Sequence, residues 1–239
     1  MQAKTFPIVA AATISLVLGH QDKASAISAI STIFSGNNAG LVGGALYFDV
    51  NITNAQGLVF TSIDTNVCNN YLLPSDRCNA PPGRLGGLNV YITGPGVSFV
   101  GNETNAGAWS LVASGTGASA ASNTPTSVNI SDFTLAPGQY GFALVANNWN
   151  HAYTIGTGSN QSFSNSDLAL SLGSASNVPF TQPIYSPRVW NGTLYYQPQS
   201  VPGPLPILGV AAAFGFSRQL RKRIKRHRET SSVSTSIGT

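Results

Sequence analysis

Hydrophobic and polar residues alternate with a period of two along most of the middle of the chain. In 44–53 (GALYFDVNIT), every second residue from Leu46 to Ile52 is apolar, whereas Asp49 and Asn51 between them are polar. Because successive side chains of a strand point to opposite faces, this pattern predicts a strand with one buried face. Similar short segments follow at 57–66, 88–93, 109–114, 127–135, 139–147, 167–172 and 193–197.

Clusters of Gly, Pro and Asn separate these predicted strands. No segment of 27–200 has the pattern of an amphipathic helix, beyond a short turn at 26–33. Regular short strands with such turns predict an all-β fold, an antiparallel β-sandwich of the Greek-key or jelly-roll kind. We expect one domain at 34–198, with a low-complexity loop at 115–127.

Two local features refine this prediction. Segments 44–53 and 57–66 are separated by a short Asn-containing connection, which favours a hairpin between them. The segment 135–140 (LAPGQY) fits a tyrosine corner, in which the Tyr140 hydroxyl bonds back to the preceding connection, and the alternative is an ordinary hairpin with Tyr140 half-buried.

The N-terminus has the three parts of a secretory signal. Lys4 provides a short basic region, 8–18 is apolar, and the sequence from Ala24 to Ala26 (ASA) matches a cleavage site. We therefore expect a signal helix in a signal peptide of 1–26, cut after Ala26. A buried N-terminal helix is the weaker alternative, because the segment is apolar all round and has no amphipathic stripe.

Charge is scarce and unevenly distributed. Only 8% of the 239 residues are charged, against about 25% in typical soluble chains. The net charge is +4, yet 27–200 holds three arginines and six acidic residues, whereas 201–239 holds seven basic residues and one acidic residue. A nucleic-acid-binding domain needs a basic surface, so the acidic middle part excludes that class.

The C-terminus resembles a membrane-retention signal. A Pro-rich motif is followed by an apolar stretch at 207–216 and a basic run at 218–228. Residues 205–216 would span about 18 Å as a helix, against a hydrocarbon core of about 30 Å, which suits a transient transmembrane helix. Basic residues after such a helix stay on the cytoplasmic side. An amphipathic surface helix is the alternative.

The segment VPGPLPILGVAAAFGFSRQLRKRIK resembles the C-terminal sorting signal of the PEP-CTERM family, in its cyanobacterial variant. The resemblance covers about 25 residues and assigns the sorting motif to Val201, Pro202, Gly203, Pro204, Leu205 and Pro206. It assigns the basic stop to Arg218, Arg221, Lys222, Arg223, Lys225 and Arg226. Gly203 stands where the namesake pattern has Glu, and a polar tail at 229–239 follows the basic run, whereas most such signals end sooner.

The resemblance implies a route for the protein. Signal peptidase and then exosortase, a membrane-embedded cysteine protease that cuts near the Pro motif, would be transient partners. The protein would be held at the inner membrane before its release to the cell surface or extracellular matrix. The body also looks like exported bacterial β-sandwich domains that carry this tail, which implies no biochemical activity.

The two cysteines, Cys68 and Cys78, are closely spaced. In an exported chain such a pair predicts a disulfide, which would stabilise the fold by roughly 2–3 kcal/mol. A metal site is the less favoured alternative, because only Asp76 lies nearby as a further ligand. We expect no metal site and no cofactor, and calcium is unsupported because no D-x-D-x-D run is present.

The body lacks the residue patterns of common enzymes. His151 is its only histidine, and no G-x-S-x-G or H-E-x-x-H motif occurs. We expect His151 to be a loop or strand-edge side chain, and the protein not to be an enzyme.

The aromatic residues are the main functional lead. Trp149 lies among asparagines and is expected to be exposed, whereas Trp109 and Trp190 are expected in the core. Trp149 and Tyr153 on one surface could stack against a glycan, such as an exopolysaccharide. The sequence thus leaves two functions: a non-enzymatic exported surface or matrix protein, or a carbohydrate-binding module. Exposure of both aromatics favours the module, and burial favours the structural protein.

Overall fold

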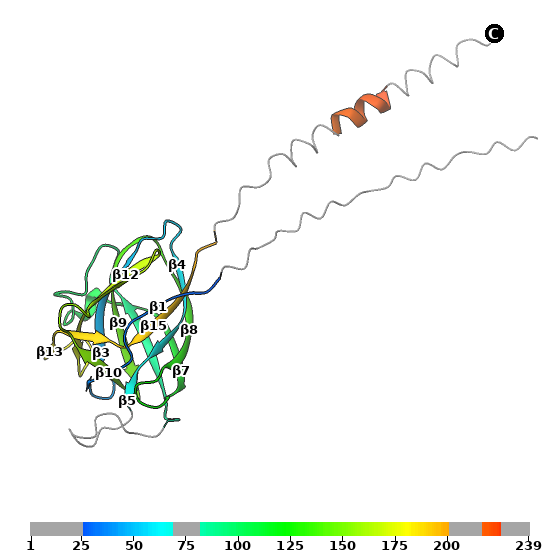
Figure 1. Ribbon diagram of the computed structural model, residues 1–239. Coiled ribbons are helices and arrows are strands. Elements are labelled where there is room, and N and C mark those ends of the chain that lie inside the picture. Colours follow the sequence, from blue (N-terminus) through cyan, green and yellow to red (C-terminus); the bar gives the residue numbers. More distant parts are fainter. Residues whose placement is uncertain (1–25, 69–81, 201–216, 226–239) are drawn as a thin grey trace, which may run out of the picture. The chain divides into compact units, whose positions relative to one another are not determined.

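The computed structural model describes residues 26–68, 82–200 and 217–225 (Figure 1). They fall in two units, a β-domain that ends at Gln199 and a C-terminal unit, which are considered separately. The signal-peptide residues through Ala24, the sorting motif at 201–206, Cys78 and Arg226 lie outside the described residues. The apolar region 8–18 of the predicted signal helix and the predicted transmembrane helix at 205–216 also lie outside them.

The β-domain is built on one large antiparallel sheet with the strand order β1-β15-β4-β8-β7-β6-β9-β3-β12-β11, with β13 beside β12. Its strands are β1 (Ser28–Ser31), β3 (Ala45–Ile52), β4 (Leu58–Thr65), β6 (Leu85–Ile92), β7 (Ser110–Ala118), β8 (Thr126–Leu135), β9 (Gly138–Asn147), β11 (Ser162–Ser164), β12 (Leu168–Ser176), β13 (Ile184–Tyr185) and β15 (Gly192–Pro198). The all-β, antiparallel prediction is confirmed.

A second sheet is small and is centred on β10 (Asn150–Ile155). Its other strands are β2 (Asn38–Ala39), β5 (Val67–Cys68) and β14 (Arg188–Trp190), all antiparallel to β10. A short 3-10 helix, η1 (Ala106–Ala108), lies in the connection between β6 and β7.

The large sheet curls until its two walls face each other. Phe60 of β4 and Phe142 of β9 meet edge to face across the interior, with ring centroids 5.8 Å apart. β7 joins the walls, since it pairs with β6 along its length but with β8 only near Gly115 and Thr116. The outcome is close to a barrel, formed by one sheet, whereas the sequence predicted a sandwich.

The barrel closes at a seam between β1 and β11, the two ends of the strand order. Asn165, directly after β11, donates from Nδ2 to the Ala29 carbonyl (3.4 Å) and to the Tyr196 hydroxyl (2.7 Å). A side-chain amide therefore links the sheet ends where no strand ladder does.

The predicted hairpin between 44–53 and 57–66 is wrong. β3 pairs with β9 and β12, whereas β4 pairs with β15 and β8. The connection crosses from one wall to the other, so that both strands turn their apolar faces to the same interior. Alternation fixes which face of a strand is buried, but it does not fix the neighbouring strand.

The tyrosine corner is confirmed. The Tyr140 hydroxyl donates to the Ala136 carbonyl at 3.2 Å. The acceptor, Ala136, belongs to the two-residue connection between β8 and β9. This connection takes the chain from one wall of the barrel to the other. β9 then pairs with β6, which gives β6 to β9 the strand order of a Greek key.

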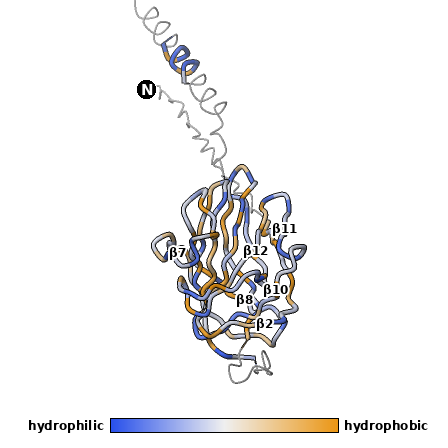
Figure 2. Tube along the Cα trace, turned by 90° about the vertical axis from the view of Figure 1, so that its left-hand side faces the viewer, coloured by the Kyte–Doolittle hydropathy of each residue, from blue (hydrophilic) through white to orange (hydrophobic). Residues whose placement is uncertain are grey.

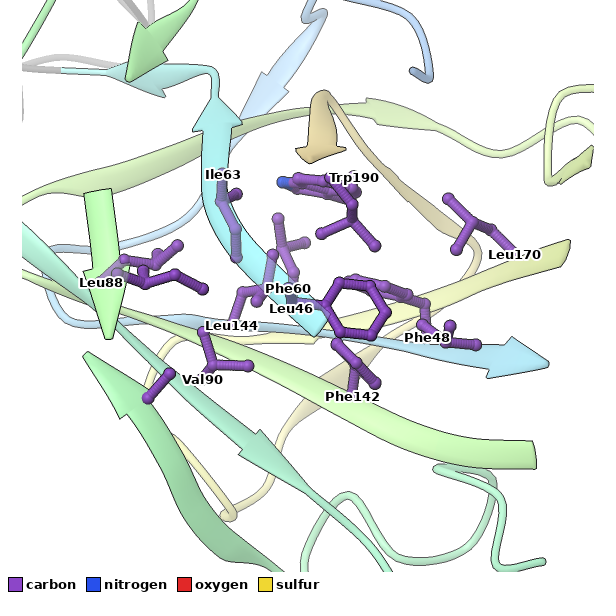
Figure 3. Close-up of a cluster of buried hydrophobic side chains, with 14 of the residues drawn as sticks. Leu46, Phe48, Phe60, Ile63, Leu88, Val90, Phe142, Leu144, Leu170 and Trp190 are labelled. Atoms are coloured by element: carbon purple, nitrogen blue, oxygen red, sulfur yellow. The ribbon is translucent and has the colours of Figure 1, made fainter. Parts of the chain in front are cut away.

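The barrel interior is filled by apolar side chains from both walls (Figure 3). Trp190 stacks on Phe48, with centroids 5.2 Å apart and planes 4° apart. Apolar and polar positions alternate along the strands (Figure 2), as the sequence pattern predicts. Labelled members of this core are Leu46, Phe48, Phe60, Ile63, Leu88, Val90, Phe142, Leu144, Leu170 and Trp190.

A second, smaller cluster lies on the outer face of β3 and β9. The Tyr47 ring contacts Trp109 (5.7 Å) and Phe180 (6.1 Å), which come from the connections that cover this face. Tyr47 is therefore buried, although alternation places it opposite to the barrel core. Covering connections, rather than the sheet alone, bury this side of the strand.

The N-terminal boundary of the domain differs from the prediction. Residues 28–31 form β1, where a short turn was expected, and they pair with β15. Only Ile30 of this strand is buried, so four residues leave little periodic signal. The folded domain thus begins near Ser28 rather than at 34.

The C-terminal unit is described only as a helix at 217–225. It carries Arg218, Arg221, Lys222, Arg223 and Lys225 of the predicted basic stop, all exposed. Within the described parts of the chain, no helix has the length and hydropathy needed to cross a bilayer.

Replacing Tyr140 by Phe should destabilise the domain by about 1 kcal/mol, because the corner hydrogen bond is lost while the ring remains. Urea unfolding of wild type and variant measures this. Tyr91→Phe is the matched control, since the Tyr91 hydroxyl makes no hydrogen bond in the described structure, and it should be neutral. Equal stability of wild type and Tyr140→Phe would contradict a structural role for the corner.

Candidate functional site

Trp149 is buried, with none of its side chain exposed. It enters the barrel beneath Gly86 of β6, and its Nε1 donates to the Arg84 carbonyl at 2.9 Å. The predicted exposure of Trp149 is therefore wrong. The preceding Asn148 makes the turn with a positive φ of 59°, which leads Trp149 inward rather than into a surface loop.

Tyr153 is also buried, with 4% of its side chain exposed. It lies on β10, opposite Trp190 of β14 and Asn38 of β2. Among the described residues, no aromatic side chain belongs to the strongly exposed hydrophobic ones. The exposed aromatic surface at Trp149 and Tyr153 that would favour a carbohydrate-binding module is thus not formed, whereas the predicted burial of Trp109 and Trp190 is confirmed.

The sequence did contain a signal for this burial. Trp149, His151 and Tyr153 occupy alternate positions, as expected for a strand with one apolar face. The surrounding asparagines favoured a loop, yet Asn150 is itself buried and donates from Nδ2 to the Gly40 carbonyl at 3.3 Å. Every residue from Trp149 to Thr154 is buried, so the alternation indicated only part of this burial and the asparagine-rich composition indicated none of it.

His151 was expected to be a loop or strand-edge side chain, and this prediction is wrong. The residue is buried inside the domain. Its Nε2 is 2.9 Å from the Leu144 carbonyl, and its Nδ1 is buried without a hydrogen-bond partner in the described structure. Burial lowers the pKa of His151 to about 4. The neutral ring contacts a backbone carbonyl and no nucleophile, which fits a packing role.

This burial makes stability depend on pH. The pKa of His151 is about 6.5 in the unfolded chain and about 4 in the folded one, so its contribution is complete above pH 6.5 and is lost as pH falls to about 4. The loss should be on the order of 3 kcal/mol. His151→Gln cannot take up the proton, so its free energy of unfolding should fall less between pH 6.5 and 4. Parallel pH profiles by urea unfolding would refute this.

Three carboxylates of the domain are held by hydrogen bonds. Asp49 accepts bonds from Ser98 Oγ (2.7 Å), the Phe99 amide (2.9 Å) and Gln139 Nε2 (2.9 Å). Asp64 accepts from Ser127 and Tyr195, and Asp167 from Asn54 and Tyr196. Each carboxylate fastens neighbouring strands or a connection, which is a structural use of its charge.

Cys68 is disulfide-bonded, at the end of β5 and opposite Asn150 of β10. Cys78, the other cysteine of the chain, lies outside the described residues. Ala26, the last residue of the predicted cleavage site, is exposed.

An open groove lies at the start of β6, and three of its lining residues are glycines of β6 and β7. Gly86 is required by packing, since an added Cβ would lie 2.5 Å from the indole of Trp149. The groove is lined by Leu85, Gly86, Gly87, Thr116, Gly117, Ala118, Asn147 and Asn148.

The structure brings Tyr153 and Tyr185 together around a residue that the sequence analysis did not single out. The guanidinium carbon of Arg188 lies 5.7 Å from the ring centroid of Tyr153 and 5.9 Å from that of Tyr185. Arg188 comes from β14, Tyr153 from β10 and Tyr185 from β13. The sequence signal was weak, because it consists of one arginine in a domain poor in positive charge.

Among known proteins, no family model, curated protein or solved structure matches this chain.

Gly86→Ala should destabilise the domain by roughly 1–3 kcal/mol, because the new methyl group would collide with Trp149 inside a packed barrel. Thermal or urea unfolding measures the loss. Gly94→Ala is the control, since an added Cβ at Gly94 meets nothing within 4 Å. If both variants were equally stable, Trp149 could not lie beneath Gly86.

Proposed function

We propose that the protein is a non-enzymatic, exported cell-surface or extracellular-matrix protein that is processed at both ends. The observation that carries this proposal is the place of the two ends of the β-domain. β1 and β15 are paired antiparallel strands, with Ser28 opposite Tyr196 (Figure 1). Chain entry and exit therefore lie side by side at one end of the barrel.

Both predicted processing sites are immediately outside the fold. A cut after Ala26 leaves only Ile27 before β1, and Ile27 is exposed. At the other end, the Gln199 amide makes a last bond to the Gly57 carbonyl (3.0 Å), and the predicted sorting motif begins at Val201. Proteases cut accessible segments, and the described residues next to the two proposed cuts, 26–27 and 199–200, are exposed and lie outside the strands.

The proposed route has three steps. Signal peptidase removes 1–26, the helix predicted near 205–216 holds the protein transiently in the inner membrane, and an exosortase then cuts near 201–206. The basic stop would remain on the cytoplasmic side. The adjacent ends allow one membrane to hold both signals, with the small sheet at the opposite end of the barrel.

The test is mass spectrometry of the surface-exposed protein from a host with an exosortase and from the same host without it. We expect an N-terminus at Ile27 in both, and loss of the tail only where exosortase is present. Deleting 201–239 should give an exported, untethered protein, and Ser substitutions in the basic stop should impair retention. An intact tail on the mature surface protein would contradict cleavage and leave a plain anchor.

A carbohydrate-binding module is the second candidate. Burial of Trp149 and Tyr153 removes the argument on which it was first based. What supports it instead is Arg188, a cation flanked by two tyrosines, whose chemistry is considered next.

A further inference from the structure

We propose that Arg188, flanked by Tyr153 and Tyr185, binds the carboxylate of an acidic polysaccharide. The binding chemistry belongs to the β-domain alone. The proposal depends on the proposed export only for the place where the protein would meet such a polymer.

The charge of Arg188 is not neutralised by the described residues of the protein. Its Nη1 donates to the Pro187 carbonyl at 2.8 Å, and its Nε is buried without a hydrogen-bond partner. No carboxylate of the described structure forms an ion pair with it. A partly buried cation without a partner is unfavourable, so an external anion would relieve a cost that the fold already carries.

The guanidinium of Arg188 is held in place by its neighbours. Two aromatic rings flank it, and Tyr185 is fixed in turn by Asn177, whose Nδ2 donates to the tyrosine hydroxyl at 3.3 Å. Cation–π contacts of this kind restrict where the planar fork of an arginine can lie. Nη1 and Nη2 lie at the end of that fork and can together donate to the two oxygens of a carboxylate.

Partly exposed apolar surface lies next to the Arg188 guanidinium. Tyr185 is partly exposed, and Ile155, opposite Arg188 on β10, is 42% exposed. Together they offer apolar surface for the carbon face of a sugar ring next to the carboxylate. A uronic acid carries both groups on one ring.

The charge of the domain argues against denser polyanions. Only two arginines, Arg84 and Arg188, are described in the domain, against five acidic residues: Asp49, Asp64, Glu103, Asp132 and Asp167. A nucleic acid would face repulsion over most of this surface. One cation beside apolar surface suits a single acidic sugar unit, with useful affinity arising from many copies along a polymer.

The experiment titrates the full chain, in a neutral detergent, with tetragalacturonate and with its neutral methyl ester, using ligand-observed NMR. Wild type should bind tetragalacturonate with a Kd on the order of 1 mM and the ester at least about tenfold more weakly. Arg188→Gln should lose about the same factor toward the acid, and Arg188→Lys should bind with intermediate affinity because the charge remains and the fork is lost.

Arg84→Gln is the matched control. Arg84 is the other described arginine of the domain, and its Nη2 bonds to Asn148 Oδ1 (2.8 Å) rather than to a carboxylate. This variant should bind like wild type, and thermal unfolding should show that all variants are folded. The proposal is overturned if wild type does not bind, if the ester binds as well as the acid, or if Arg84→Gln loses as much as Arg188→Gln. Equal binding of a sulfated oligosaccharide would overturn the carboxylate assignment. None of these binding experiments tests where the chain is cut. Failure of the binding proposal can therefore be distinguished from failure of the proposed export and processing.

Discussion

Two tryptophans seated against glycines fix the inside of the barrel, and the remaining structure depends on them. Trp190 stacks flat on Phe48 and packs so closely over Gly192 that a Cβ there would collide with its ring. Trp149 lies in the same way beneath Gly86. A large indole ring fits inside a small, densely packed barrel only where the adjacent strand residue has no side chain. Each of these two tryptophans therefore requires the glycine that it packs against.

Because apolar side chains fill the interior of the barrel, we look for functional groups on its surface and at the ends of the domain. The barrel core is lined by apolar side chains, and the buried His151 meets only a backbone carbonyl. Asp49, Asp64 and Asp167 are held in structural hydrogen bonds. The pairing of β1 with β15 places both ends of the domain together, which is compatible with the proposed cleavage of the chain on either side of it. Arg188 differs from the other described arginine of the domain, Arg84, because its Nε is buried without a hydrogen-bond partner and two tyrosine rings lie beside its guanidinium.

The longer strands could be predicted from alternation in the sequence, because eight or more residues leave a clear period, and in β8 buried and exposed positions do alternate. In β3 and β9 much of the opposite face is buried as well, which the period did not predict. The partners of these strands could not be predicted, and the β3–β4 hairpin failed for that reason. Strands of two to four residues, such as β1, β5 and β14, carry too few positions for a period. The Arg188 cluster unites three strands distant in sequence, so only the folded chain reveals it. At Trp149 the surrounding asparagines favoured an exposed loop, whereas the segment from Trp149 to Thr154 is buried on both faces.

The most direct test of this account is the solvent exposure of the tryptophans, since all three lie in the β-domain and are buried. Intrinsic fluorescence of the native protein, with acrylamide as quencher, measures it. The account predicts a blue-shifted emission and weak quenching that an acidic polysaccharide leaves unchanged, because Arg188 rather than a tryptophan meets the ligand. A red-shifted emission that acrylamide quenches readily and that polysaccharide protects would place Trp149 on the surface and contradict the account.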